Sequence, residues 1–421
     1  MLANELEKKI RSCNRCGFCQ DVCPTYRYTK NEAALARGRV RLARTVLEGK
    51  YNWGEEKEIT EHIKTCLLCK ACVTNCPSSV ATDEIVMEAR KEINYAAGLN
   101  LFHKLVYRGL LSDQKRLKAA GSLARFYDNS GTRWLVKNSG LLNSVKKLKH
   151  MENILPMGLK STLRSRLPRI MIEVKKPKLR VGYFAGCATN TFFGDIGEAA
   201  VLYLQKHGCE VEVPPIQCCG GPHQSAGDFE EAQRLARENI HTFLEKDYDF
   251  IISDCATCTG TLKEYEKIFA NDENMQHKAK QFSDLVMDLN AFVVKNELIG
   301  KSAGDINKKV TYHDPCHAIR GMGVKDEPRE ILSGISGLDF VEMKEADVCC
   351  GGAGSYCFVH QEVSSGILEA KIENFIQTGA DILATSCPAC TMQLYSGLRK
   401  SGVAAQIKHP IQLLAESEGL L

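Results

Sequence analysis

The feature that most constrains this chain is its cysteine content, twenty residues in a sequence of 421. Disulfide bonds and metal ligation are the two explanations. A chain of this length buries a sufficient core without disulfides. The first ten residues, MLANELEKKI, lack the apolar stretch of an export signal, so we expect the thiols to stay reduced in the cytoplasm. Repeated C-x-x-C spacing then favours metal binding.

One cysteine motif occurs twice in the first hundred residues. Both copies read C-x2-C-x2-C-x3-C-Pro, and they comprise Cys13, Cys16, Cys19, Cys23, Cys66, Cys69, Cys72 and Cys76. The two-residue gaps let three thiolates face one cubane, Gly17 permits a turn that other residues resist, and the proline sets the exit direction. The motif is similar to that of bacterial two-cluster ferredoxins, in which the fourth cysteine ligates the other cluster.

Crossed ligation of this kind predicts two [4Fe–4S] clusters. One is assigned to Cys13, Cys16, Cys19 and Cys76, and the other to Cys66, Cys69, Cys72 and Cys23. Zinc is the alternative, but it usually takes two well-separated C-x-x-C pairs. Residues 33–47, between the motifs, have a helical pattern. This predicts an α-helical ferredoxin domain over residues 1–100. Its arginines form either a solvated face or a set of donors to cluster sulfurs.

Residues 101–180 contain no cysteine and carry 19 Lys and Arg against 4 Asp and Glu, a local net charge of +15. We expect a helical linker, broken at Gly, Asn and Pro. The excess of positive charge allows three interpretations: a solvated surface, a docking surface for an acidic partner, or a peripheral contact with the cytoplasmic face of an anionic membrane. Aromatic residues are not regularly interleaved with the basic ones, so we expect no nucleic-acid contact. The sequence has no apolar run of membrane-spanning length.

The remaining residues form an internal duplication. Val181-Gly-Tyr-Phe-Ala-Gly-Cys187 parallels Val310-Thr-Tyr-His-Asp-Pro-Cys316, and two further cysteine segments repeat at offsets of 131 and 132 residues. Such a period indicates two tandem domains, which we place at 181–305 and 306–421. Short apolar runs at 180–184, 250–253 and 382–384 are expected to be strands. Residues 197–207 and 229–243 are expected to be amphipathic helices. The alternation predicts α/β layers with parallel strands, and cysteines at the strand ends.

Each copy of the duplication supplies five cysteines at matching positions. They are Cys187, Cys218, Cys219, Cys255 and Cys258 in the first copy, and Cys316, Cys349, Cys350, Cys387 and Cys390 in the second. The pattern resembles the CCG domain of heterodisulfide reductases and of iron–sulfur subunits of flavin-linked dehydrogenases. The resemblance implies two further iron–sulfur clusters, with non-cubane [4Fe–4S] clusters as the expected type. Zinc or an ordinary cubane in one or both copies stays open. Cys209 and Cys357 fall outside the pattern and are expected to be buried as small apolar residues.

Three histidines flank these cysteines: His223, His313 and His317. A histidine beside a redox centre either relays protons to a quinone or a disulfide, or serves a structural role, and the sequence leaves both open. No complete Gly-x-Gly-x-x-Gly follows a strand, so we expect no dinucleotide-binding fold in this chain. Any FAD is therefore expected on a partner subunit.

Over nearly its whole length the chain resembles the iron–sulfur subunits of glycolate oxidase and of related D-lactate dehydrogenases. The segments that carry the likeness are Cys13-Asn-Arg-Cys-Gly-Phe-Cys, Ala36-Arg-Gly-Arg, Cys66-Leu-Leu-Cys-Lys-Ala-Cys and Phe184-Ala-Gly-Cys. The resemblance implies an electron-transfer subunit of an oxidoreductase complex. Its partners would be an FAD-containing dehydrogenase subunit, in some relatives an electron-transfer flavoprotein, and a quinone or other acceptor. We expect no hydroxyacid oxidation by this chain alone.

Two other functions compete with this one. A heterodisulfide-reductase-like catalyst would reduce a disulfide or a quinone at a CCG-bound cluster. A scaffold with structural zinc would carry out no redox chemistry, and metal analysis would reveal it. The substrate, the direction of electron flow and the subunit stoichiometry are not set by these motifs, because the substrate site lies on the flavin subunit in the family that the chain resembles.

Overall fold

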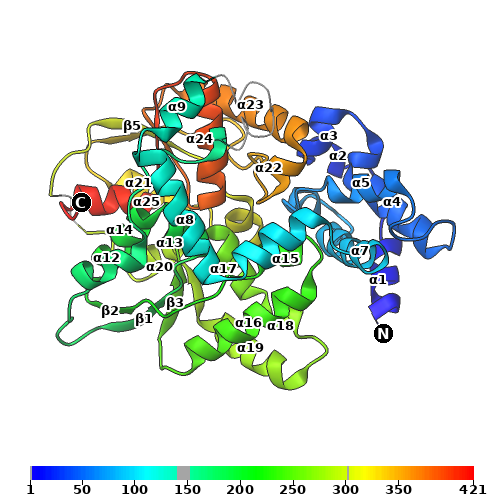
Figure 1. The fold of residues 1–421 in the computed structure, drawn as a ribbon, viewed down its shortest axis with the longest axis horizontal. Helices are drawn as coiled ribbons and strands as arrows, with labels where there is room; N and C mark the ends of the chain where they lie inside the picture. The colour runs from blue at the N-terminus through cyan, green and yellow to red at the C-terminus, as the bar shows by residue number, and fades with distance from the viewer. Residues whose placement is uncertain (1, 140–151, 301–302) are drawn as a thin grey trace.

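The computed structural model describes residues 2–139, 152–300 and 303–421, and Figure 1 shows their arrangement. The first part is helical, as the sequence predicts. Its α-helices are α1 (Leu2–Arg11), α2 (Cys19–Val22), α3 (Pro24–Thr29), α4 (Ala36–Leu47), α5 (Lys57–Lys64), α6 (Ala71–Thr74) and α7 (Thr82–Ala97). The helix predicted at 33–47 is divided, because Leu35 is extended between a short 3-10 turn, Glu32–Ala34, and α4.

The linker is also helical. It contains a π-helix, His103–Leu111, followed by α8 (Gln114–Asn129), α9 (Thr132–Asn138) and α12 (Leu163–Ile170). Asp113 caps α8 by accepting hydrogen bonds from the backbone N–H groups of Lys115 and Arg116. The basic residues at 146–149 lie outside the described residues.

The duplicated part contains two four-stranded parallel sheets of identical topology, which confirms the predicted α/β layers. The first sheet has the order β2-β1-β3-β4 and the second the order β6-β5-β7-β8. The strands are β1 (Leu179–Tyr183), β2 (Cys209–Glu212), β3 (Phe250–Ser253), β4 (Val286–Asp288), β5 (Lys308–Tyr312), β6 (Leu338–Phe340), β7 (Ile382–Ala384) and β8 (Gln406–Lys408). The register pairs Val181 with Phe250 in the first sheet and Val310 with Ile382 in the second. The central strands β3 and β7 are mainly apolar and buried, as expected for strands that are covered on both faces.

The helices of the two copies alternate with these strands. In the first copy they are α13 (Cys187–Phe192), α14 (Gly194–Lys206), α15 (Gly221–Ser225), α16 (Phe229–Leu244), α17 (Ala256–Lys263), α18 (Tyr265–Ile268), α19 (Glu273–Leu285) and α20 (Leu289–Lys295). The second has a π-helix, His317–Met322, and α21 (Glu327–Gly334), α22 (Tyr356–Val359), α23 (Gln361–Thr378), α24 (Pro388–Lys400) and α25 (Pro410–Ser417). Helix α14 begins three residues before the prediction, and Leu163 of α12 packs so closely that a Cβ on Gly194 or Gly197 would clash with it.

The two copies form one body. One apolar core combines Phe184 and Ile251 with Leu383 and Leu394, and a second core combines Val181 with Val310. The strand ends also meet directly, because the backbone N–H of Ala256 donates to the carbonyl oxygen of Ser386 at 2.9 Å. The cysteine-bearing loops that follow the strands therefore face each other across the junction.

The ferredoxin-like helices dock on both copies. In Figure 1 they lie at one side of the molecule, with α3 beside α23. Helix α3 packs so tightly that a Cβ on Gly366 would lie 1.9 Å from the ring of Tyr28. Lys70 forms an ion pair of 2.8 Å with Glu264 of the first copy, and Arg27 forms one of 2.6 Å with Glu345 of the second.

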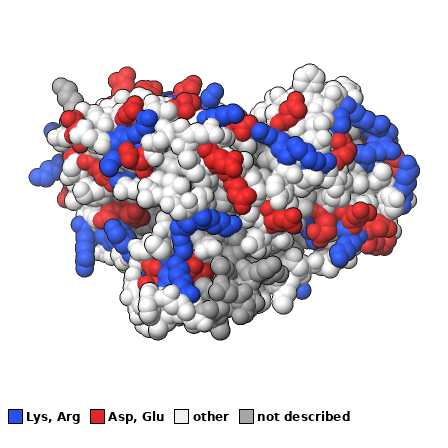
Figure 2. Space-filling view, turned by 90° about the horizontal axis from the view of Figure 1, so that it is seen from above, with Lys and Arg blue, Asp and Glu red and all other residues white. Residues whose placement is uncertain are grey.

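Charges of both signs lie close together over much of the face shown in Figure 2. Part of the positive charge of the linker is paired. Arg133 contacts Asp128 at 2.6 Å and Glu152 at 2.7 Å, and Arg166 contacts Glu198 at 2.6 Å. Among the described helices, none has the length and apolar character needed to span a lipid bilayer.

Candidate metal centres

The first set of ferredoxin-motif cysteines lies near the surface. Cys16 is exposed, and Cys13, Cys19 and Cys76 are half-buried. Cys13 and Cys76 pack on the same apolar group, around Val40, although they belong to different copies of the motif. Gly17 has a φ of 93°. This left-handed conformation favours glycine, in agreement with the turn predicted at this position. The crossed assignment requires Cys76 beside the first motif, and this packing supports it.

The second set surrounds one small cavity, which is lined by Cys23, Cys66, Cys69 and Cys72. Burial raises the pKa of Cys72 well above its ordinary value, and the neighbouring sulfurs of Cys66, Cys69 and Cys23 raise it further. The fold thus brings the fourth cysteine of one motif to the first three of the other. Ligation by these four residues stays a prediction that their geometry supports.

Of the two alternatives left open for the arginines of α4, the solvated face does not hold for Arg39. Its side chain is only 2% exposed and lines the cavity of the second set. It donates to the carbonyl oxygen of His62 at 2.8 Å and to Thr25 Oγ1 at 3.2 Å, and Thr25 Oγ1 lies 3.2 Å from Cys23 Sγ. Arg41, by contrast, is exposed. Side-chain periodicity on α4 could not separate these two residues, because Arg39 is buried by the packing of α3 and α5 against α4.

The second set adjoins the second copy of the duplication. Cys69 packs in one apolar group with Cys316, Cys349 and Tyr356. Burial raises the pKa of Cys69, and the sulfur of Cys349 raises it further. No sequence pattern indicates which copy the ferredoxin-like domain would contact, so this neighbourhood is a finding of the structure.

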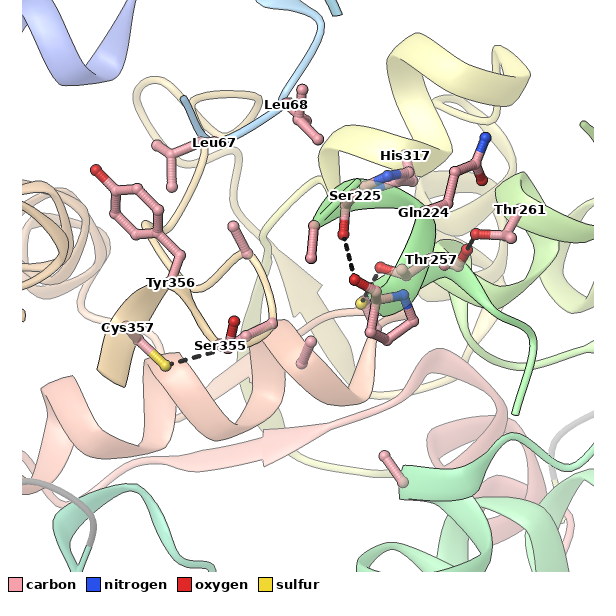
Figure 3. A pocket seen from close by; sticks show the side chains of 18 of the residues that line it. Leu67, Leu68, Gln224, Ser225, Thr257, Thr261, His317, Ser355, Tyr356 and Cys357 are labelled. Atoms are coloured by element: carbon pink, nitrogen blue, oxygen red, sulfur yellow. Dashed lines mark hydrogen bonds between the residues drawn. The ribbon is translucent and has the colours of Figure 1, made fainter. Parts of the chain in front are cut away.

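All ten cysteines of the duplicated motifs line one cavity of about 420 Å³. Figure 3 shows Tyr356, Ser355 and Cys357 on one side of it and His317, Thr257 and Thr261 on the other. Leu67 and Leu68, from the loop between Cys66 and Cys69, line it at the top of the view. The two sites are therefore two ends of a single chamber at the junction of the copies.

The sulfurs follow one another without a break across this chamber. In the first copy the sulfur of Cys218 neighbours those of Cys187 and Cys219, and the sulfur of Cys219 neighbours that of Cys258. In the second copy the order is Cys316, Cys349, Cys350, Cys390 and Cys387. The two rows of sulfurs meet where Cys255 contacts Cys387. The sulfur of Cys387 also lies 3.3 Å from Thr257 Oγ1.

The chemistry of this donor set fits an iron–sulfur centre. None of the twenty cysteines, all of which are described, forms a disulfide. Hydrogen bonds from neighbouring thiols hold the pKa of Cys219, Cys349 and Cys387 well below the ordinary value. Eight of the ten cysteines are buried and Cys187 and Cys316 are half-buried. Ten sulfurs this close together would repel one another as thiolates, and bound iron would remove that repulsion. Five thiols per copy exceed the four of a tetrahedral zinc site.

His313 faces the thiols of its own copy. One of its ring nitrogens and the sulfurs of Cys350 and Cys390 all lie within 4.8 Å of one another. Both ring nitrogens are buried and lack a hydrogen-bond partner among the described residues. Burial lowers the pKa of His313 to about 3, so the imidazole is neutral near pH 7. It can donate a hydrogen bond to a cluster sulfur or bind metal through nitrogen.

The other two predicted histidines have different surroundings. His317 lines the cavity, and its ring packs against Gly260 of the first copy. His223 is fully buried but is absent from the cavity wall; its Nε2 lies 2.9 Å from Ser112 Oγ of the linker. Cys209 and Cys357 are both buried, as expected, and Cys357 also lines the cavity.

Sequence reasoning missed the contribution of the linker to this cavity. His103 and Tyr107, from the π-helix, line it. His103 Nε2 lies 3.0 Å from Asp228 Oδ2, and Arg108 donates to both oxygens of Asp228, at 2.7 and 2.8 Å. The only available signal was a histidine and a tyrosine four residues apart in a basic segment, and this spacing alone indicates no chemistry.

Three family models match the chain. They are a 4Fe-4S dicluster domain over residues 9–80, the linker region of the glycolate oxidase iron-sulfur subunit over 98–155, and the cysteine-rich CCG domain over 181–263 and again over 310–395. The order of parts predicted from the cysteine spacing is therefore confirmed.

Relatives match along most of the chain. A protein of Bacillus subtilis named probable glycolate oxidase iron-sulfur subunit is 32% identical over 98% of this chain and 95% of its own length. A subunit of fumarate reductase (CoM/CoB) from Methanothermobacter marburgensis is 26% identical over 97% of this chain and 72% of its own length. Lactate utilization protein A of Bacillus subtilis is 30% identical over 56% of this chain and 99% of its own length.

A crystal structure of a hypothetical protein from Helicobacter pylori shares the fold. The TM-score is 0.59 and the sequence identity 12%, and the match covers 99% of this chain and 72% of that chain. At this identity the likeness concerns architecture alone.

Proposed function

Because the chain belongs to the family of glycolate oxidase iron–sulfur subunits, we propose that it is the electron-transfer subunit of a flavin-dependent 2-hydroxyacid dehydrogenase complex. It accepts electrons from a partner subunit that carries FAD and passes them to a quinone or another acceptor. Iron–sulfur clusters on its cysteines supply the one-electron chemistry. Glycolate and D-lactate are the proposed substrates of the partner subunit.

The observation that carries this proposal is the succession of cysteine sets from the surface to the cavity. It starts at exposed Cys16, continues through the second ferredoxin set to Cys69, and reaches the cavity at Cys349 and Cys316. It ends in the first copy, beyond the contact of Cys387 with Cys255. A structural zinc protein has no need for successive sites that join a surface to a chamber.

The surroundings of these sets suit electron transfer. Buried Arg39 places a positive charge beside the second ferredoxin set, and a nearby cation raises the reduction potential of a cluster. The first set stays partly exposed, which suits a docking partner. We propose two [4Fe–4S] clusters at the ferredoxin sets and two further clusters, of non-cubane type, in the CCG domains.

Anaerobic purification with metal analysis tests the proposal. Four [4Fe–4S] clusters correspond to about 16 irons per chain. The complex with its flavoprotein should show iron–sulfur EPR signals after addition of glycolate or D-lactate, whereas the isolated chain should show none. Colourless protein without iron or sulfide would refute the proposal.

A heterodisulfide-reductase-like activity is the second candidate. Its support is the single chamber at the junction of the copies and the relationship to the fumarate reductase whose name refers to CoM/CoB. The isolated chain, reduced with dithionite and then freed of it, should then turn over a low-molecular-weight disulfide. Reoxidation by quinone but not by disulfide would favour the first function.

We further propose that the linker binds the surface of an anionic membrane. Leu123, Phe126, Trp134 and Leu135 are each at least 59% exposed, and exposed Lys115, Lys118 and Lys137 occur in the same helices. Apolar and basic side chains together suit an anionic lipid interface. Vesicles that contain phosphatidylserine should retain the protein at low salt and release it as salt rises. Retention by neutral vesicles as well, or by none, would refute this contact.

A further inference from the structure

One part of the cavity wall is built where the linker meets the first copy of the duplication. The linker supplies His103 and Tyr107 from a π-helix, and the first copy supplies Asp228 from the N-terminus of α16. π-Helical segments are rare and occur often at functional sites. Here the π-helix places both rings side by side, with centroids 4.5 Å apart, at the cavity.

We propose that His103, held by Asp228, is the proton donor for the acceptor that is reduced in this cavity. The inference rests on the proposed function, because it requires an acceptor that takes up protons together with electrons. A quinone is such an acceptor. It gains two electrons from the reduced cysteine-bound centres and two protons, one at each oxygen.

The geometry assigns separate roles to the two ring nitrogens. Nε2 lies 3.0 Å from Asp228 Oδ2, so the carboxylate fixes the ring with a proton on that nitrogen. Nδ1 then carries the proton that is transferred, and the ring becomes neutral when a quinone oxygen takes it up. A proton from solvent then restores the one lost from Nδ1, and a second proton from solvent binds the other quinone oxygen. A carboxylate that orients an imidazole in this way is a recurrent arrangement in proton-transfer sites.

Asp228 carries a negative charge in the folded protein. Burial would raise its pKa, but hydrogen bonds from Arg108 and His103 outweigh burial and hold the pKa well below the usual range. Arg108 also reaches Glu230 at 3.0 Å, and the side chain of Glu230 is 85% exposed. The groups that face His103 are Asp228, Tyr107 and His223. The positive charge of Arg90 counteracts the rise that burial causes in the pKa of Tyr107. Asp228 is therefore ionised and accepts a hydrogen bond from the Nε2–H group of His103.

The test compares two oxidants of the full chain with its clusters, reduced beforehand and mixed anaerobically. Menadione needs protons and ferricyanide does not. We expect His103→Gln to slow oxidation by menadione about 100-fold and to change the ferricyanide rate less than about twofold. The pH dependence of the menadione rate should disappear. Imidazole should restore part of the rate in His103→Ala.

Two variants serve as matched controls. His241→Gln changes an exposed histidine of α16, whose side chain is 76% exposed, and should behave as wild type. Asp228→Asn keeps an amide oxygen that can cap α16, so the fold should persist, and it should slow the menadione reaction about tenfold. The EPR spectrum of each reduced variant should match that of wild type.

Each outcome bears on a different claim. Wild-type protein that reduces ferricyanide but not menadione would refute both the quinone acceptor and this inference. A His103→Gln protein with the wild-type menadione rate and pH profile would overturn this inference alone. Equal loss of both reactions, or an altered EPR spectrum, would assign His103 a structural role and would also overturn it.

Discussion

The two copies of the duplicated domain share a topology and five cysteines but differ in what surrounds those cysteines. In the second copy His313, Asp314 and His317 occupy the positions of Phe184, Ala185 and Ala188 in the first. The first copy, in turn, has Asp254 before its C-x-x-C where the second has Ser386.

These differences change the hydrogen bonds of a shared tyrosine. Tyr183 donates to Asp254 at 2.7 Å, whereas Tyr312 lies 2.6 Å from the hydroxyl of Ser386. The copies also differ in their neighbours, because Cys69 adjoins the second copy and the linker histidine adjoins Asp228 of the first. Equal ligand sets therefore occupy unequal environments, and we infer that the second copy receives electrons and the first is the site of proton-coupled chemistry.

The largest expected effect comes from removing one thiol in each copy. Cys349→Ser removes the sulfur that adjoins Cys69, so electrons from the ferredoxin sets should no longer reach either copy. Cys218→Ser should abolish the EPR signal of the first copy and leave reduction of the second intact. Stopped-flow reduction with EPR of frozen samples measures both. Identical behaviour of the two variants would contradict the proposal that electrons reach the second copy before the first.

The second prediction concerns the nitrogen donor of the second copy. His313→Phe gives this copy the residue that the first has at this position, and Phe fills the buried space that the ring leaves. We expect the EPR signal of the second copy to shift while that of the first stays unchanged, because Cys350 and Cys390, whose sulfurs lie beside this ring, belong to the second copy. Phe184→His is the reciprocal variant. An unchanged spectrum in His313→Phe would show that the imidazole does not influence the metal.

The third prediction uses the residues that cap the helix after the last strand of each sheet. Asp288 caps α20 and His409 caps α25, and both are buried. Burial raises the pKa of Asp288 to about 6 and lowers that of His409 to about 4. The stability that Asp288 contributes is therefore full below about pH 4 and is lost as pH rises through 6. The contribution of His409 is full above about pH 6.5 and is lost as pH falls through 4.

Two asparagine variants separate the opposite pH dependences of stability that Asp288 and His409 contribute. Relative to wild type, Asp288→Asn should gain stability as pH rises from 5 to 6, and His409→Asn should gain it as pH falls over the same range. Each difference should approach about 1.4 kcal/mol per pH unit. Anaerobic urea unfolding at several pH values measures both, and slopes of equal sign would contradict the prediction.

The smallest expected effect is a difference of about 1 kcal/mol between two variants of the amide side chains that contact the paired cysteines Cys218–Cys219 and Cys349–Cys350. Asn239 accepts from the backbone N–H of Gln217 at 2.9 Å and donates to the carbonyl oxygen of Cys218 at 3.1 Å. Gln393 donates to the carbonyl oxygen of Cys350 at 3.3 Å. Asn239→Ala should cost about 2 kcal/mol, because it leaves the N–H of Gln217 and the carbonyl oxygen of Cys218 unpaired. Gln393→Ala should cost about 1 kcal/mol, because it unpairs the carbonyl oxygen of Cys350 while Ser364, its other partner, keeps its hydrogen bond to Gly351. Denaturant unfolding measures the free energy of unfolding of both variants. A larger loss of stability in Gln393→Ala than in Asn239→Ala would contradict the prediction.

The sequence by itself determined the parts of this protein and their order. Cysteine spacing is local geometry, so it predicts the ferredoxin-like domain and both cysteine-rich copies before any fold is known. The apolar runs at 250–253 and 382–384 correspond to β3 and β7, because a strand buried on both faces needs a continuous apolar segment.

Only the tertiary structure decided which sites are neighbours. The contact of Cys255 with Cys387, the position of Cys69 beside Cys349, the burial of Arg39 and the pairing of His103 with Asp228 all join segments that are distant in sequence. Such contacts depend on how whole domains pack, and no local pattern encodes them. Local spacing therefore sets which ligands each site has, and packing sets the path between sites and the groups that face the cavity.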